Sequence, residues 1–220
     1  MIPGEADLVE RLEALLGAPV ELRESHMLAG GASKEAWAVD VTAGGEPLEL
    51  FVRRAAGGVI HETATLPLEQ EYRVIEAAFA EGVRVPRPYG YLGELEGREA
   101  FATERVGGET IGRRIVTRPE LAVAREALPL QLAGVVAKVH SIPAATLPFL
   151  RTSDELERNE RELDSVGEPH PAIELGLHWL RENRPEQLPP VVLHGDFRIG
   201  NVVVSERGLE YLLEDRKSVV

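Results

Sequence analysis

The chain has 220 residues, 44% of them hydrophobic and 28% charged, which is typical of a soluble globular protein of one domain or two small lobes. A net charge of −13 argues against broad binding to nucleic acids or anionic membranes, because both partners require a basic protein face. The absence of cysteine excludes disulfides and thiolate metal sites and fits a cytoplasmic location. The sequence contains no apolar run long enough to span a bilayer, its acidic N-terminus does not resemble a signal peptide, and it points to no protein partner.

The first half of the chain alternates short β-type runs with two amphipathic segments. Apolar residues recur at helical spacing in 6–16 and again in 66–80, where Glu81-Gly82 is typical of a helix end. Short β-type runs, several of them separated by glycine turns, predict strands over 21–28, 35–41, 48–54, 87–93 and 98–106. We therefore expect this half to be a β-rich unit.

The second half begins at the glycine pair Gly107-Gly108 and is mainly helical in pattern. The predicted elements are, in order, helices over 120–139, 154–163 and 172–183, a strand over 189–195, and a hairpin over 201–213 that turns at Glu206-Arg207-Gly208. This order of elements predicts an α+β fold with two lobes, residues 1–106 and residues 107–214.

The octapeptide HGDFRIGN, residues 194–201, lies between the predicted apolar strand and the hairpin. Phosphoryl transfer needs a carboxylate that orients or deprotonates the acceptor hydroxyl, and an oxygen ligand for Mg²⁺. Asp196 and Asn201 could supply both groups to one pocket from a single loop. The same residues are also typical of a polar turn whose side chains cap local backbone groups, and the octapeptide alone leaves both interpretations open.

From Leu28 to Leu213 the sequence resembles the aminoglycoside phosphotransferase-like branch of the protein-kinase-like superfamily, in particular the kinase domain fused to some acyl-CoA dehydrogenases. The resemblance implies a bilobal fold with a β-rich N-lobe and a mainly helical C-lobe. It also implies Asp196 as the catalytic base and Asn201 as a magnesium ligand. Members that act on antibiotics typically have His-Pro where this chain has Arg198-Ile199, which points away from an antibiotic acceptor.

The segment LAGGASKEAWAVDV, residues 28–41, resembles the hairpin that covers the ATP phosphates in this family. Small residues such as Gly30 and Gly31 let backbone N–H groups approach oxygen atoms closely. The resemblance places the Ser33 side chain near a phosphate. Most such runs are plain turns, so the segment is informative only through its order in the chain.

The third predicted strand, LELFVRR, lacks the lysine that grips the α- and β-phosphates in kinases. Arg53 stands at that position, and a guanidinium can bind phosphate through two hydrogen bonds. The resemblance pairs this cation with Glu71 on the following helix, so we expect the two charged groups to lie within ion-pair distance. If they do not, Lys34 is the next candidate. Taken alone, Arg53 and Glu71 would rather suggest a solvated arginine on an edge strand and a surface glutamate.

The segment FATERVGGETIG, residues 101–112, resembles the joint between the lobes, where backbone groups hold the adenine ring. This implies that Glu104 and Val106 contact the base through their peptide atoms and that Gly107 and Gly108 form a hinge. The alternative is an ordinary turn at the end of a strand.

The histidines are not interpreted as catalysts. We expect His140, at the end of the long helix, to be a structural core residue, and His194 to support the loop that carries Asp196. The remaining four show no spacing typical of metal ligands: His26, His61, His170 and His178.

In the family, the hairpin after the catalytic loop ends in an aspartate that is the second magnesium ligand. The chain has Glu214 at this position, and we expect this glutamate to take the metal position. The remaining residues, DRKSVV, are what the common sequencing-adapter sequence GATCGGAAGAGCGTCGTG encodes. We therefore expect residues 215–220 to be non-native, the helical lobe to be truncated, and the 220-residue chain to be inactive or poorly soluble.

Together these features predict an ATP- and Mg²⁺-dependent kinase that phosphorylates a hydroxyl group of a small molecule, for example a hydroxyacyl compound. Two alternatives stay open: a non-catalytic nucleotide-binding module of the pseudokinase type, and a kinase of aminoglycosides or choline. A metal-dependent hydrolase built on His194 and Asp196 is disfavoured, because the sequence offers no further ligands at metal spacing.

Overall fold

A computed structural model describes residues 2–28, 34–56, 66–150, 154–186 and 188–213 of the chain. The proposed phosphate-covering residues Gly30, Gly31 and Ser33, and the proposed metal ligand Glu214, lie outside the described residues.

The first half of the chain forms a five-stranded antiparallel sheet in the order β1-β2-β3-β5-β4. Its strands are β1 (Val20–Leu28), β2 (Lys34–Ala43), β3 (Glu46–Ala55), β4 (Pro88–Leu95) and β5 (Arg98–Glu104). Each predicted strand of this half is therefore confirmed. The β2–β3 connection is a two-residue turn at Gly44-Gly45, both with positive φ, as tight antiparallel hairpins require.

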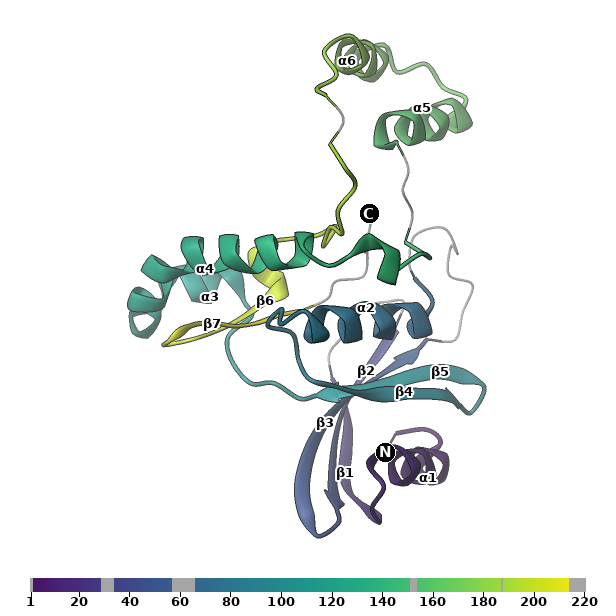
Figure 1. Cartoon of the computed structure of the whole chain (residues 1–220), viewed down its shortest axis with the longest axis vertical. Helices are drawn as coiled ribbons and strands as arrows, with labels where there is room; N and C mark the ends of the chain where they lie inside the picture. Colours follow the sequence, from purple (N-terminus) through teal and green to yellow (C-terminus); the bar gives the residue numbers. More distant parts are fainter. Residues whose placement is uncertain (1, 29–33, 57–65, 151–153, 187, 214–220) are drawn as a thin grey trace.

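One helix covers each face of this sheet (Figure 1). Helix α1 (Glu5–Leu16) packs on one face, where Leu8 and Leu12 join the buried side chains of β2 and β3, such as Val39 and Leu50. Helix α2 (Leu68–Ala80) covers the opposite face, where Tyr72 packs against Phe101 of β5. Because successive strand residues point to opposite faces, the sheet contributes to two separate hydrophobic clusters.

The second half is mainly helical and carries a second, two-stranded sheet, β6-β7. Its elements are α3 (Gly112–Thr117), α4 (Ala122–His140), α5 (Glu155–Val166), α6 (Pro171–Glu182), β6 (Val202–Ser205) and β7 (Gly208–Leu212), with 3₁₀ turns at Pro119–Leu121, Ala144–Thr146 and Ile199–Asn201. The strands of 20–55 and those of 202–212 belong to different sheets, as the α+β prediction requires. Helices α5 and α6 contact each other and lie apart from both sheets (Figure 1).

A single hydrophobic cluster connects α2 with the second half of the chain. It includes Ile75 of α2, Val135 and Val139 of α4, and Val204 and Leu209 of the β6–β7 hairpin. Gln131 of α4 also accepts a hydrogen bond from the backbone N–H of Leu209 at 2.8 Å. The hairpin that follows the HGDFRIGN loop is thus held against both α2 and α4.

The structure corrects one predicted strand and adds one helix. Residues 189–195, all of which are described, form no strand, although Val192 is buried in the core. Pro189 and Pro190 have no N–H to donate to a ladder, so an apolar pattern there does not suffice for a strand. The sequence does not predict the short helix α3, because six residues are too few to show a helical period.

The joint between the two halves is tightly packed at Gly108. This glycine has φ +145°, and a Cβ atom added to it would collide with the Val203 side chain and lie 3.2 Å from the Val204 carbonyl oxygen. The next residue, Glu109, exchanges two backbone hydrogen bonds with Val204, at 2.9 and 3.0 Å. A Cβ atom added to Gly107 would have no described atom within 4 Å and would cause no φ strain, so only Gly108 of the pair needs to be glycine.

Replacing Gly108 by alanine should therefore destabilise the chain by about 1–3 kcal/mol, because the new methyl group forces both backbone strain and overpacking against β6. The matched variant Gly107→Ala should change the free energy of unfolding by less than about 0.5 kcal/mol. Urea denaturation followed by circular dichroism measures both. Equal effects of the two substitutions would contradict the packing of this joint.

Candidate active site

A cleft of about 510 Å³ lies between the five-stranded sheet and the β6–β7 hairpin. Its apolar wall includes Phe51, Phe101 and Val203. Its polar lining brings together residues that are far apart in the sequence: Lys34, Arg53, Thr103, Glu104, Arg198 and Asn201. Four of the residues predicted from the sequence thus line one cavity, namely Arg53, Glu104, Val106 and Asn201.

Glu71 of α2 binds two cations from neighbouring strands. Arg53 of β3 lies 2.6 Å from Glu71 Oε1, and Lys34 of β2 forms an ion pair with Glu71 Oε2. The side chains are only 4% (Glu71), 7% (Lys34) and 14% (Arg53) exposed. Arg53 and Glu71 therefore lie within ion-pair distance, as expected. Lys34 does not replace Arg53 but binds the other oxygen of the same carboxylate.

The strand register explains why both cations reach Glu71. Lys34 pairs with Ala55, and Ala36 pairs with Arg53, so Lys34 and Arg53 are diagonal neighbours on one face of the sheet. The sequence contained this signal, since counting residues back from the Gly44-Gly45 turn yields the same register. The prediction that Lys34 is only a substitute for Arg53 did not take this register into account.

The Lys34–Glu71–Arg53 cluster has one net positive charge beside the cleft. A buried carboxylate is stable when paired, and here both of its oxygens have cationic partners. The excess charge lies on groups that line the cleft, Lys34 Nζ and the Arg53 guanidinium. Both are donors suited to phosphate oxygens, the arginine through a planar fork and the lysine as a point charge.

The HGDFRIGN loop is held by hydrogen bonds within and beside it. Asn201 is 6% exposed and donates through Nδ2 to the Asp196 carbonyl oxygen at 2.7 Å and to Asp196 Oδ2 at 3.2 Å. Arg198 Nε also donates to Asp196 Oδ2, at 2.8 Å. The capping bonds of a polar turn are thus present, and Asn201 lines the cleft as well; Asp196 adjoins the cleft through Asn201.

His194 supports this loop, as expected. Its Nε2 atom lies 2.9 Å from the Leu213 carbonyl oxygen, which can only accept, so Nε2 carries the proton. Its Nδ1 atom then accepts from the backbone N–H of Asp196 at 3.3 Å. Both ring nitrogens of the neutral imidazole are engaged with the backbone, which leaves Asp196 as the base candidate on the loop.

The joint segment borders the cleft, where Glu104, Arg105 and Val106 belong to the lining. The N–H of Glu104 donates to the Arg87 carbonyl oxygen at 2.8 Å. The N–H of Arg105 donates to the Glu49 carbonyl oxygen at 3.2 Å. The Arg105 side chain forms ion pairs with Asp40 at 2.7 Å and Glu49 at 2.6 Å, which fix the segment to β2 and β3. Burial and then the negative charge of Glu104 raise the pKa of the Tyr211 hydroxyl of β7.

The structure corrects the expectation for His140, which is exposed. It is the last residue of α4, and its neighbour Val139 points into the core instead. One step along a helix rotates a side chain by about 100°, so His140 points in a different direction from Val139, and only Val139 faces the core.

The sheet, its covering helix α2, the cleft and the polar loop have the arrangement of a kinase-like phosphotransferase, and comparisons with known proteins agree. The chain superimposes on the GDP complex of aminoglycoside 2'-phosphotransferase-IIIa with a TM-score of 0.59 at 14% sequence identity, over 88% of this chain and 66% of that one. At this identity the likeness shows the fold alone. Residues 26–213 match the phosphotransferase enzyme family, so the chain belongs to that family.

Sequence relatives include acyl-CoA dehydrogenase family member 11 from Homo sapiens and from Gallus gallus. Identity is 26% and 29%, respectively, over alignments of 148 positions that cover 62% of this chain. The matched segment is 19% of the length of each relative, so the chain corresponds to about a fifth of those proteins. Among the described residues, no helix is both long and apolar enough to cross a membrane.

Glu71→Gln should destabilise the chain by about 3–5 kcal/mol, because it leaves two largely buried cations without their anion. Glu69→Gln, on the exposed face of the same helix, is the matched control and should change stability by less than about 0.5 kcal/mol. Chemical denaturation at several salt concentrations measures the difference. If Glu71→Gln lowered the free energy of unfolding only at low salt, the ion pairs would be exposed to solvent, and the burial of the cluster would be contradicted.

Proposed function

We propose that this chain is an ATP-dependent phosphotransferase that transfers the γ-phosphate to a hydroxyl group of a small molecule. One observation carries the proposal: Lys34 and Arg53, both paired with Glu71, line one cleft together with Asn201, in a chain of the phosphotransferase enzyme family. In this proposal residues 1–106 and 107–214 act as two lobes around the nucleotide.

The adenine ring contacts the peptide groups of Glu104 and Val106, and the phosphates reach Arg53 and Lys34. Gly30, Gly31 and Ser33 cover the phosphates in the same proposal. The solved neighbour contains GDP, which is a property of that protein. It supports a nucleotide in this cleft, and ATP is our choice for the donor.

The residues present fit a magnesium ion. The Asn201 amide nitrogen is directed at Asp196, which leaves the amide oxygen as a ligand of the kind that Mg²⁺ prefers. Glu214 is proposed as a second ligand. Among the described residues no group of three or more acidic or histidine side chains forms a metal site, which suits a cation held mainly by nucleotide phosphates. Such an ion would neutralise charge on the phosphates.

Asp196 accepts the proton of the acceptor hydroxyl as that oxygen attacks the γ-phosphorus, and ADP leaves. Arg198 and Asn201 orient the carboxylate through hydrogen bonds to Oδ2. His194 takes no part in proton transfer, because both of its nitrogens are bonded to the backbone.

We further propose a hydroxyacyl compound as the acceptor. The support is similarity to proteins named for acyl-CoA dehydrogenase activity, of which this chain matches about a fifth, and the Arg198-Ile199 pair in the loop. This part of the proposal is independent of the nucleotide site.

A second candidate is a module that binds nucleotide without transferring phosphate. It is favoured by the ion pair between Arg198 Nε and Asp196 Oδ2 at 2.8 Å, which occupies the carboxylate, and by Glu214 at the expected aspartate position. Nucleotide binding without turnover in the Glu214→Asp variant would decide for this module.

The nucleotide site predicts that Arg53→Ala and Lys34→Met each weaken ATP binding by about tenfold or more, because each removes one charged phosphate donor. Arg23→Ala is the control, an exposed arginine of the same sheet that pairs with Glu21. Fluorescence titration with a labelled ATP analogue, with and without Mg²⁺, measures the dissociation constants. Binding that is unaffected by both cation substitutions would rule out this cleft as the phosphate site.

Asp196→Ala should leave ATP affinity within about threefold and lower turnover by about 10²–10⁴, because it removes only the base. We expect no measurable turnover in the 220-residue chain and detectable turnover after Glu214→Asp, so the rates are compared in the Glu214→Asp background and ATP binding is compared in both backgrounds. Release of ADP with a panel of hydroxyacyl-CoA, aminoglycoside and choline acceptors provides the rates. Equal loss of binding and turnover on Asp196→Ala would indicate a structural role for this residue.

A further inference from the structure

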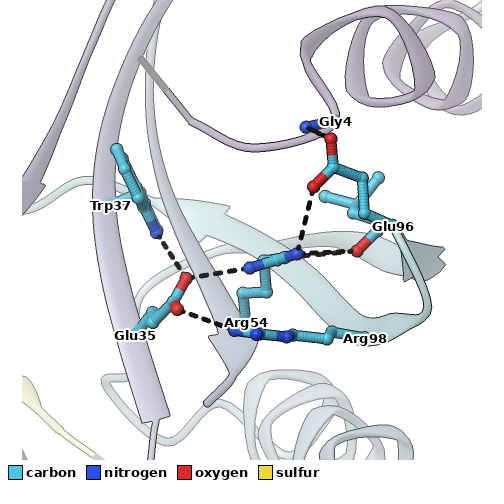
Figure 2. Close-up of polar contacts among 7 residues, drawn as sticks. Gly4, Glu35, Trp37, Arg54, Glu96 and Arg98 are labelled. Atoms are coloured by element: carbon cyan, nitrogen blue, oxygen red, sulfur yellow. Dashed lines mark hydrogen bonds and ion pairs between the residues drawn. The ribbon is translucent and has the colours of Figure 1, made fainter. Parts of the chain in front are cut away.

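A second charged cluster lies on the face of the sheet opposite the Lys34–Glu71–Arg53 cluster. Figure 2 shows its residues. Glu35 of β2 accepts hydrogen bonds from Arg54 of β3 at 3.0 Å and from Arg98 of β5 at 3.0 Å. Its Oε2 atom also accepts from Trp37 Nε1 at 3.2 Å. One carboxylate thus connects three strands on the face that α1 covers.

Arg54 is the central residue of this network and is only 2% exposed. Its Nε and NH2 groups both donate to the Leu95 carbonyl oxygen, at 3.2 and 3.1 Å, and its NH1 donates to Glu35. A buried guanidinium is unfavourable unless its donors are satisfied, and here they bind in a planar fork with little freedom to move. The end of β3 is therefore held in one position relative to β2 and β4.

The network extends to the N-terminal segment through Glu96. This residue has φ +50°, the one positive φ among the described non-glycine residues, and forms the β4–β5 turn with Gly97. Its Oε1 atom accepts from the backbone N–H of Gly4 at 2.9 Å, and its Oε2 atom lies 3.8 Å from Arg54 NH2. The residue that precedes α1 is thus connected to Arg54 (Figure 2).

The two charged clusters are alternate residues of the same strand pair. Glu35 is the register partner of Arg54, and each directly follows one cation of the other face, Lys34 and Arg53. Since successive strand residues point to opposite faces, the Glu35–Arg54 bond and the directions of Lys34 and Arg53 depend on the same strand register.

Glu99, which follows Arg98 on β5, binds the start of α2, the helix that carries Glu71. Glu99 points to the α2 face, where its Oε2 atom accepts from the backbone N–H of Leu68, the first residue of α2, at 3.2 Å. Its Oε1 atom accepts from the Tyr91 hydroxyl at 2.9 Å. The β4–β5 hairpin therefore holds both Arg54 on one face and the start of the helix that carries Glu71 on the other.

We propose that Arg54 and Glu35 are positioning residues for the Lys34–Glu71–Arg53 cluster: they contact no ligand, and they hold the β2–β3 ends so that both cations meet Glu71 at the cleft. This inference rests on the proposed function for its effect on nucleotide binding, whereas its effect on the cluster itself is independent of any ligand.

The first test uses the ligand-free chain. Arg54→Met should speed hydrogen exchange at the amides of 34–36 and 53–55 by about tenfold or more, and should shift the Arg53 Nε–H signal in NMR spectra. Arg23→Met is the matched control on β1 and should leave both readouts unchanged. Should Arg54→Met not fold, Arg54→Lys and Glu35→Gln are measured instead, since both keep the side-chain volume nearly constant. Unchanged exchange and an unchanged Arg53 signal in the folded variant would overturn the inference, whether or not the chain binds ATP.

The second test is a double-mutant cycle on ATP binding with Arg53→Ala. If Arg54 acts through the cluster, Arg54→Met alone weakens binding about fivefold or more, and adds little once Arg53 is already replaced. Additive losses would contradict positioning through Arg53. If the unsubstituted chain binds no ATP, the proposed function fails, and the exchange measurements still decide whether Arg54 positions the cluster.

Discussion

The arrangement of the cleft depends on the carboxylate of Glu71, which two cations from neighbouring strands share. Burial makes this interaction demanding, because neither a lone carboxylate nor two unpaired cations would be stable in an interior of low dielectric constant. The requirement brings α2, β2 and β3 together at one point, with Lys34 and Arg53 on one wall of the cleft. Because the cluster contains two cations and one carboxylate, one positive charge is left at this wall of the cleft for an anion.

The sheet separates two polar systems that share the same strands. On the cleft face lie Lys34 and Arg53, and on the α1 face lie Glu35 and Arg54, one residue further along each strand. A shift of register by one residue would exchange the two sets, so neither can move without the other. Strand pairing, apolar packing of α1 and the polar bonds of the β4–β5 turn therefore all specify the same register.

The loop on the other wall is held by the hairpin that follows it. Asn201 closes the loop on Asp196, while His194 joins it to Leu213 at the end of the hairpin. The hairpin in turn packs into the cluster formed with α2 and α4 and against the joint at Gly108. The two walls of the cleft thus share one hydrophobic core, which agrees with the membership of residues 26–213 in a single phosphotransferase family.

The sequence by itself determined the order and type of most elements, because strand and helix periods and glycine turns are local properties. It also identified HGDFRIGN as the polar loop and, through family resemblance, the pairing of Arg53 with Glu71. Only the tertiary structure showed that residues 189–195 form no strand, that His140 is exposed, and that Lys34 shares Glu71. Each of these depends on which remote residues a segment meets, through ladder partners, helix orientation or strand register, and local patterns do not specify such contacts.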